Sequence, residues 1–234
     1  MIARACALAL LILFLPRDAA SDGRLNFRID FSRTNIEGAY NDVGLDWQGL
    51  EFELEKEFIK PKVVLSGFSL GLRREVFYGF TGFGTEKDVN RWDEGTYFVL
   101  RMYRTFNVSS DRAWSIGPSV SILYGIPGTT LDRTIVASGD TGLASTHVFP
   151  VRNSDVPKLL ANKASLVTDS ALLYPEMSFV VRRRFAKGSI VLDWLAGFRI
   201  IRFGIVDSGT QTDRFEDRRV FIPSVGLRIG FRVF

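Results

Sequence analysis

The only histidine of the chain, His147, lies in a polar segment with Ser145, Thr146, Ser154 and Asp155 nearby. Nucleophilic acyl transfer requires a serine activated by a histidine that an acid orients. The spacing of these residues matches no acyl-enzyme motif, and one histidine in a polar segment is more often a surface residue. We therefore expect no catalytic residue, and an enzyme is the minority alternative.

Charged side chains spaced two residues apart are the second group that could do chemistry. Residues at this spacing share one face of a β-strand. We expect such a face to form a network of opposite charges, with these members: Arg24, Arg28, Glu51, Glu53, Glu55, Glu57, Arg73, Arg101, Arg199 and Arg228. The acidic residues form no spaced metal-binding loop and the glycines form no phosphate-binding motif, so we expect no metal and no cofactor.

Segments of alternating hydrophobicity carry these charges. Alternation with period two indicates strands that are apolar on one face and polar or small on the other. Eight segments show it: 24–33, 48–58, 64–76, 95–106, 113–125, 170–183, 188–203 and 218–234. After the first twenty residues, no stretch reaches the eighteen or so apolar residues of a transmembrane helix.

The links between these segments alternate between short and long. The short links are 59–62, 107–112 and 184–187, and the long ones are 34–47, 77–94, 126–169 and 204–217. Tight turns at one end, longer loops at the other and an even strand count are typical of transmembrane β-barrels. The sequence therefore predicts an all-β fold: an eight-stranded antiparallel up-and-down transmembrane β-barrel with short periplasmic turns and long extracellular loops.

The size of the side chains indicates which face points outward. The apolar row holds the bulky residues Trp114, Trp194, Phe27, Phe52, Phe68, Phe98, Phe179, Phe198 and Phe231. The other row contains Gly67, Ser69, Gly71, Gly117, Ser119, Ser121, Gly226 and Gly230. Eight strands enclose an interior that side chains just fill, so we expect the bulky row to face lipid. A soluble barrel would turn that row inward. We also expect tyrosines, including Tyr97 and Tyr174, at the interface near the loops.

The charged row would then line the interior. If the first two strands pair across their link, Arg28 faces Glu53 and Arg24 faces Glu57. A buried charge without a partner is costly, so we expect a paired network that plugs the barrel. The functional alternative is a selective or proton-linked path along the glutamates.

The N-terminus reads as a secretory signal. Arg4 precedes an apolar run over residues 5–15, and small residues close the segment at Ala20. We therefore divide the chain into a signal peptide, 1–20, and a barrel domain, 21–234. The single cysteine, Cys6, lies in the signal, so no disulfide is expected in the mature chain. The formal net charge of +4 gives little support to nucleic-acid binding.

The third long link, 126–169, is unusually long for a structureless connection, so we expect it to have structure or a function. Residues 158–166 could form a short helix that is capped by Ser154 or Asp155 and begins near Pro157. The alternative is a disordered loop, which the glycine, serine and threonine of 128–145 favour.

The closing segment ends the chain on alternating Val225, Leu227, Ile229, Phe231 and Val233, followed by Phe234. With the signal and the strand pattern, it resembles the small outer-membrane barrels of the OmpA/OmpX-like and OmpW-like kind. The resemblance implies the cell outer membrane of a Gram-negative-type bacterium, contact with outer-membrane lipid and lipopolysaccharide, and insertion by the barrel assembly machinery through the last strand.

We expect a non-catalytic, porin-like barrel whose loops serve surface or lipopolysaccharide interaction; the extracellular partner stays unknown. The alternatives are transport of small hydrophobic solutes by a lateral route, as the OmpW-like resemblance implies, and an outer-membrane lipid-modifying enzyme. No residue motif transfers a function from these families.

Overall fold

The computed structural model describes residues 21–37, 42–58, 65–81, 89–126, 135–138, 145–150, 173–208 and 214–233. Within these ranges the chain forms β-strands and one 3-10 turn, η2 (Ala186–Gly188). No helix in these ranges is long and apolar enough to cross a membrane. The expected signal peptide, the expected helix at 158–166 and Phe234 lie outside the described residues.

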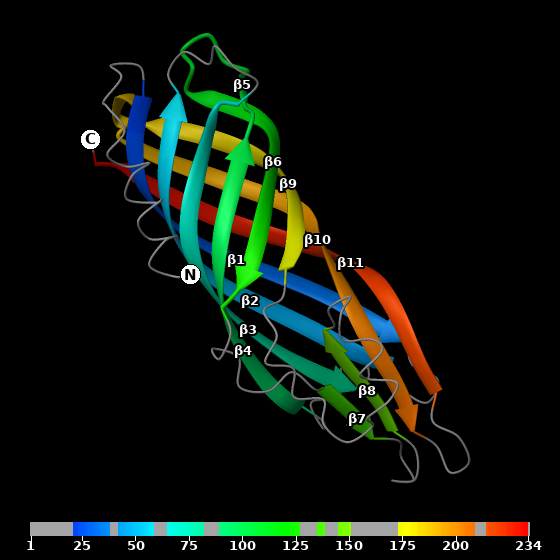
Figure 1. Ribbon diagram of the computed structural model, residues 1–234. Coiled ribbons are helices and arrows are strands. Elements are labelled where there is room, and N and C mark those ends of the chain that lie inside the picture. Colours follow the sequence, from blue (N-terminus) through cyan, green and yellow to red (C-terminus); the bar gives the residue numbers. More distant parts are fainter. Residues whose placement is uncertain are drawn as a thin grey trace.

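Eight antiparallel strands form the wall of a closed barrel (Figure 1). They are β1 (Ser21–Glu37), β2 (Asp42–Phe58), β3 (Gly67–Thr81), β4 (Val89–Tyr103), β6 (Trp114–Gly125), β9 (Leu173–Phe185), β10 (Ile190–Ser208) and β11 (Arg214–Arg232). Each pairs with the next one along the chain, and pairing of β1 with β11 closes the sheet. This is the predicted up-and-down barrel of eight strands.

Two further strands extend the wall at one end. The hairpin of β7 (Ile135–Ser138) and β8 (Ser145–Pro150) pairs through β8 with the end of β10. It lies at the end of the barrel opposite the C-terminus (Figure 1). The third long link therefore contains a strand hairpin, and 135–138 is a strand within the stretch for which disorder was the alternative. At the other end, the short β5 (Phe106–Asn107) pairs with β6.

The strands run farther toward the β7–β8 end than hydrophobicity alone predicted. Strands β1 and β2 pair as far as Glu37 and Asp42, so only 38–41 separate them. Likewise, 82–88 separate β3 from β4 and 209–213 separate β10 from β11. Three of the four expected long loops are thus largely paired strand. The extensions mix apolar and polar residues without a clear alternation of period two, as in 77–81 and 204–208, so hydrophobicity did not reveal them.

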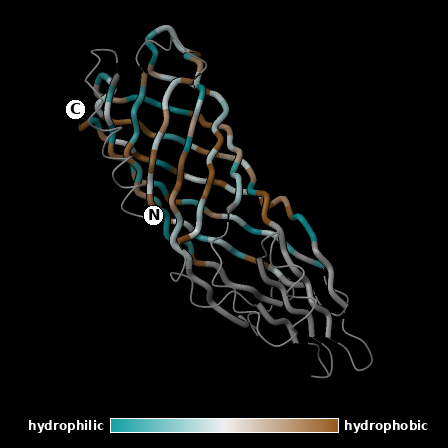
Figure 2. Tube along the Cα trace, in the orientation of Figure 1, coloured by the Kyte–Doolittle hydropathy of each residue, from teal (hydrophilic) through white to brown (hydrophobic). Residues whose placement is uncertain are grey.

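The large apolar side chains of the strands point outward. Ile29, Phe52, Leu72, Phe179 and Leu227 are each about half exposed, and 23 large hydrophobic residues are exposed among those whose side chains the structure describes. Along each strand apolar and polar residues alternate (Figure 2). Exposure of this much apolar surface would be unfavourable in water and suits a barrel surrounded by lipid. The inward-facing apolar row of a soluble barrel is ruled out.

The interior is divided into two layers. Toward the short-turn end it is filled with charged side chains. Toward the β7–β8 end lies a buried apolar cluster of Leu45, Trp47, Tyr97, Val99, Leu123, Tyr174, Ile201 and Ile222. Tyr97 and Tyr174 were expected among the interface aromatics, but they face inward and pack edge to face with ring centroids 5.5 Å apart. Both tyrosines share the face of their strands that carries the polar residues, and this position was the sequence signal that they face inward.

Candidate functional site

The charged interior of the barrel is the candidate functional site. Seven arginines and eight acidic residues are buried there: Arg24, Arg28, Arg73, Arg101, Arg182, Arg199, Arg228, Asp30, Glu51, Glu53, Glu55, Glu57, Glu75, Glu176 and Asp193. All lie on the inward phase of their strands. Every one of the eight acids contacts at least one arginine, so the charges largely neutralise one another.

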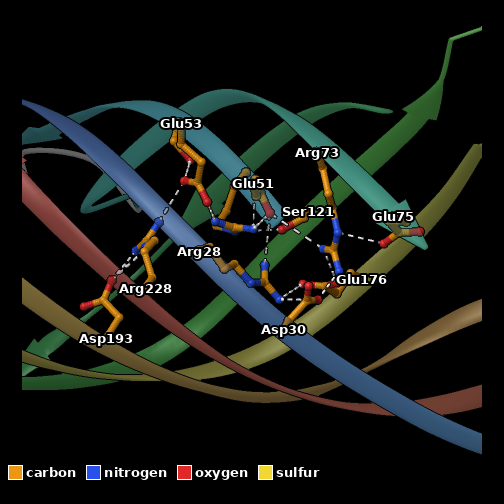
Figure 3. A network of polar contacts seen from close by, with 12 residues as sticks. Arg28, Asp30, Glu51, Glu53, Arg73, Glu75, Ser121, Glu176, Asp193 and Arg228 are labelled. Carbon is orange, nitrogen blue, oxygen red and sulfur yellow. Dashed lines mark hydrogen bonds and ion pairs between the residues drawn. The ribbon is translucent and has the colours of Figure 1, made fainter. Parts of the chain in front are cut away.

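Glu176 of β9 is the hub of the part of this network nearer the β7–β8 end (Figure 3). Its two carboxylate oxygens accept hydrogen bonds from Arg28 at 2.6 Å, Arg73 at 3.1 Å and Arg199 at 3.2 Å. Asp30 of β1 accepts from Arg73 and Arg199 as well. These residues come from four strands, so the pairs join opposite sides of the wall.

Glu75 connects the charges around Glu176 to the apolar layer. It pairs with Arg73 at 2.7 Å and Arg199 at 2.9 Å, and Tyr174 donates its hydroxyl hydrogen to Glu75 at 2.6 Å. Tyr174 belongs to the buried apolar cluster. The charged and apolar layers are therefore packed directly against each other.

Arg101 of β4 continues the network toward the short-turn end. It lies 3.1 Å from both oxygens of Glu51, forms an ion pair with Glu53, and donates to Ser121 at 2.9 Å. Glu51 also lies 3.6 Å from Arg28 and Arg73. Glu51 thus links the hub at Glu176 to the charges nearer the short-turn end.

The part of the network nearer the short-turn end is centred on Asp193, Glu55 and two arginines. Arg182 lies 2.8 Å from Asp193 and 3.0 Å from Glu55. Arg228 pairs with Asp193 and lies 2.9 Å from Glu53. The hydroxyl of Tyr103 donates to Glu55 at 2.7 Å, and its ring lies beneath the Arg182 guanidinium. Charge-assisted hydrogen bonds of this kind are the strong ones in proteins.

Glu57 and Asp22 close the network at the mouth of the short-turn end. Glu57 pairs with Arg24 at 3.0 Å, Arg182 at 3.1 Å and the half-buried Arg184 at 2.5 Å. Asp22 pairs with Arg232 at 2.6 Å. A cavity of 490 Å³ opens here, lined in part by these residues.

Glycines on the inward face make room for the arginines. A Cβ at Gly49 would overlap the Asp30 carboxylate and the Arg73 guanidinium, and one at Gly226 would lie 3.2 Å from Arg28 Nε. A guanidinium is too large to share a narrow barrel with a larger neighbour at these places. The glycines of the small row are thus used for charge packing.

All ten expected network residues lie in this interior, but the expected facing pairs differ. Arg24 contacts Glu57 as expected, although Glu55 is its partner in the strand register. Arg28 does not face Glu53. It is opposite Glu51. The register differs by two residues because the hairpin is centred between residues 39 and 40, one residue before the middle of the expected link 34–47.

Sequence reasoning did not assign five buried members to the network. These are Asp30, Glu75, Glu176, Arg182 and Asp193. Each lies on the inward phase of its strand, and that phase was the available signal. Their partners are on strands distant in sequence, so pairing could not be deduced from alternation.

Three of the residues considered for catalysis lie on a described strand. His147, Thr146 and Ser145 lie on β8, where His147 pairs with Val136 and Val206 in the strand register. Ser154 and Asp155 fall outside the described residues. No group of three or more His, Cys, Asp or Glu in the described ranges is arranged to hold a metal ion.

No family model matches the sequence, and no curated protein matches it. Among solved structures, the chain is similar to the β domain of the Bordetella autotransporter Brka. The identity is 9%, the match covers 91% of this chain and 98% of that one, and the TM-score is 0.28. A TM-score of this size is too low to transfer any property, so the fold assignment rests on the strand pairing of this chain: it is an eight-stranded antiparallel barrel with an apolar outer surface.

Proposed function

We propose that this chain is a non-catalytic barrel of the outer membrane of a Gram-negative-type bacterium. In this proposal the charged interior is a plug, and the strands and hairpin at the β7–β8 end reach the cell surface, where they contact lipopolysaccharide or another surface partner. Insertion by the barrel assembly machinery through β11 and contact with outer-membrane lipid belong to the same proposal. The single observation that carries it is the continuous buried charge network inside an apolar barrel.

The composition of the interior supports a plug more than a pore. The seven arginine side chains have relative exposures of at most 2%. Charges that were lined up along an aqueous channel would be hydrated, whereas these are paired with one another. The apolar cluster next to Glu75 adds a layer that offers ions no hydration. Eight strands leave little space beyond such side chains.

Conductance of the folded protein in a planar bilayer tests the plug. We expect no steady open-channel current, while a larger porin, measured in the same bilayers, conducts. A steady cation-selective current that Glu51→Gln reduces would contradict the plug and support the path along the glutamates.

The surface role is tested by binding of purified lipopolysaccharide to the folded protein. We expect binding by the intact chain and weaker binding by a variant in which residues 135–150 are replaced by a short linker. Equal binding by both would remove the hairpin from the proposal.

The enzyme alternative requires His147 to act on a lipid. If His147→Ala leaves the lipid A chemistry of the host unchanged, this alternative fails. Transport of small hydrophobic solutes is the other alternative, and with a plugged interior it requires an opening in the wall of the barrel.

A further inference from the structure

The barrel wall is not paired along its full height where β1 meets β11. The ladder between them ends at the pair Ser32–Ser224. Beyond that pair, β1 continues to Glu37 as a partner of β2, and the preceding part of β11 begins at Arg214 as a partner of β10. The two strands thus border the seam above Ser32 without being partners there.

Pro223 is the β11 residue next to the last pair, at the point where Arg33 would be its partner. Proline has no N–H and is found in sheets at edges or where pairing ends. Farther up, Arg218 Nη1 donates a hydrogen bond to the carbonyl oxygen of Glu37 at 3.2 Å. We call this stretch without β1–β11 pairs the window. It lies between the pair Ser32–Ser224 and the hydrogen bond of Arg218 to Glu37.

A pocket of 350 Å³ lies at the base of this window. Its outward side is apolar and includes Phe31, Pro223 and Val225, and its inward side includes Trp47 and Ser32. Trp47 also belongs to the buried apolar cluster of the interior. The pocket is therefore bounded on its inward side by a residue of the apolar inner layer.

Polar groups lie beside the apolar lining. The hydroxyl of Ser32 is buried and has no hydrogen-bond partner among the described residues. Arg33 and Asp46 form an ion pair at 3.4 Å, with the Arg33 side chain 58% exposed. Ser32 lies on the inward phase, so the polar groups that a ligand on the outward side of the pocket meets are those of Arg33 and Asp46.

The pocket lies at the border of the apolar outer surface that is nearer the β7–β8 end. Phe31 and Val225 are 51% and 59% exposed, whereas the next outward positions on β1 and β2 are the exposed Arg33 and Gln48. A volume of 350 Å³ is near the lower end of ligand pockets, which are about 300–1,000 Å³. This volume suits one acyl chain better than a lipid with several chains.

We propose that this seam binds a single-chain amphiphile, of which a fatty acid is the simplest case, entering from the membrane. The acyl chain lies over Phe31, Pro223 and Val225 with Trp47 behind it, and the polar head lies beside Arg33. This inference rests on the membrane placement proposed above, but it does not require the interior to be plugged or open.

Quenching of Trp47 fluorescence tests the site. One variant keeps Trp47 and replaces Trp92, Trp114 and Trp194 by Phe, and a matched control keeps only Trp194, which is 40% exposed on the outer surface. Both are folded into phosphatidylcholine vesicles, and 9,10-dibromostearic acid is added. We expect saturable quenching of Trp47 at low mole fractions and quenching of Trp194 only in proportion to the bromine in the membrane.

Closing the seam provides the second arm. In the Trp47-only background, Arg33→Cys with Pro223→Cys allows a disulfide between the neighbours of the last pair. We expect saturable quenching to be lost on oxidation and to return on reduction. The band of the folded protein on a gel run without boiling should stay unchanged, which shows that the variant is folded. Pro223→Val, which restores an N–H, is expected to weaken quenching if the disulfide does not form.

The outcomes separate the two proposals. Quenching of Trp47 that is proportional like that of Trp194, or that is unchanged by closure of the seam, would overturn the amphiphile site. Absence of Trp194 quenching in vesicles of dibrominated phosphatidylcholine would instead show that the outer surface does not face lipid, and the membrane placement itself would fail.

Discussion

At the scale of single residues, Glu176 connects more of the network than its sequence neighbourhood suggests. It accepts hydrogen bonds from three buried arginines on three other strands. Removal of one member of a buried ion pair leaves an uncompensated charge, which is more destabilising than loss of the pair as a whole. The hub should therefore be the most sensitive position in the plug.

We predict that Glu176→Gln lowers the free energy of unfolding by about 3–5 kcal/mol, the usual cost of breaking a buried ion pair from one side. Urea unfolding in lipid vesicles measures it. Asp111→Asn is the control, because Asp111 lies in the exposed turn and its contact to the Ala113 N–H is one that an asparagine oxygen also accepts. A change for Glu176→Gln no larger than that of the control would mean that the network adds little to stability.

Sequence reasoning named two facing pairs: Arg24 and Glu57 are in contact, whereas Arg28 is opposite Glu51 and not Glu53. The inward phase follows from alternation, and Arg24, Arg28 and the four glutamates of β2 are buried in the structure. Contacts depend on register, and the register of β1 and β2 is fixed by the centre of their hairpin, which hydrophobicity does not define. Contacts across the barrel, as between Arg28 and Glu176, join strands far apart in the sequence.

At the scale of elements, β2 shows the clearest separation of faces. Its outward residues Leu50, Phe52 and Leu54 are exposed, and they lie between Gln48 on one side and Lys56 on the other. Phe52 packs edge to face on Phe27 of β1, with ring centroids 4.9 Å apart. Phe52 is thus at the middle of the apolar surface of this strand, and Gln48 is at its edge.

We predict that Phe52→Arg destabilises the folded barrel in a bilayer by about 2–4 kcal/mol, whereas Gln48→Arg on the same face costs at most about 1 kcal/mol. The reason is depth, because an arginine at the middle of the hydrocarbon layer loses its hydration and one at the border keeps it. Unfolding titrations in vesicles compare the two. Equal effects would indicate that the outward face of β2 does not cross the hydrocarbon layer.

The inner apolar layer is the element-scale feature that alternation missed. Tyr97, Val99 and Tyr174 occupy the inward phase, but aromatic residues near strand ends are also typical of membrane interfaces. Hydrophobicity alone does not distinguish an interface residue from one that fills the barrel. The strands extend beyond the apolar outer surface, so the barrel has a second layer of interior, and these residues fill that layer.

At the scale of the whole molecule, the two ends of the barrel differ in a way that the sequence predicted only in part. The turns at one end join strands close to the paired charges, and β7 and β8 extend the wall at the other end (Figure 1). The strand number and the up-and-down order could be predicted from eight alternating segments. The added hairpin could not, because strands of four and six residues are too short for a clear alternating pattern.

Orientation in the membrane follows from this difference and gives the last prediction. Cys6 is the only cysteine of the chain and lies in the segment proposed to be removed as a signal peptide. With that segment removed, single cysteines introduced into the remaining chain report their own location. We expect Ser208→Cys, at the end of β10, to react with a membrane-impermeant maleimide on intact cells. Asp111→Cys, in the turn between β5 and β6, should react only after the outer membrane is permeabilised. Both proteins should show the same heat-modifiable folded band, which controls for misfolding. The reverse labelling pattern would place the β7–β8 end in the periplasm, and the seam between β1 and β11 would then open toward the inner leaflet.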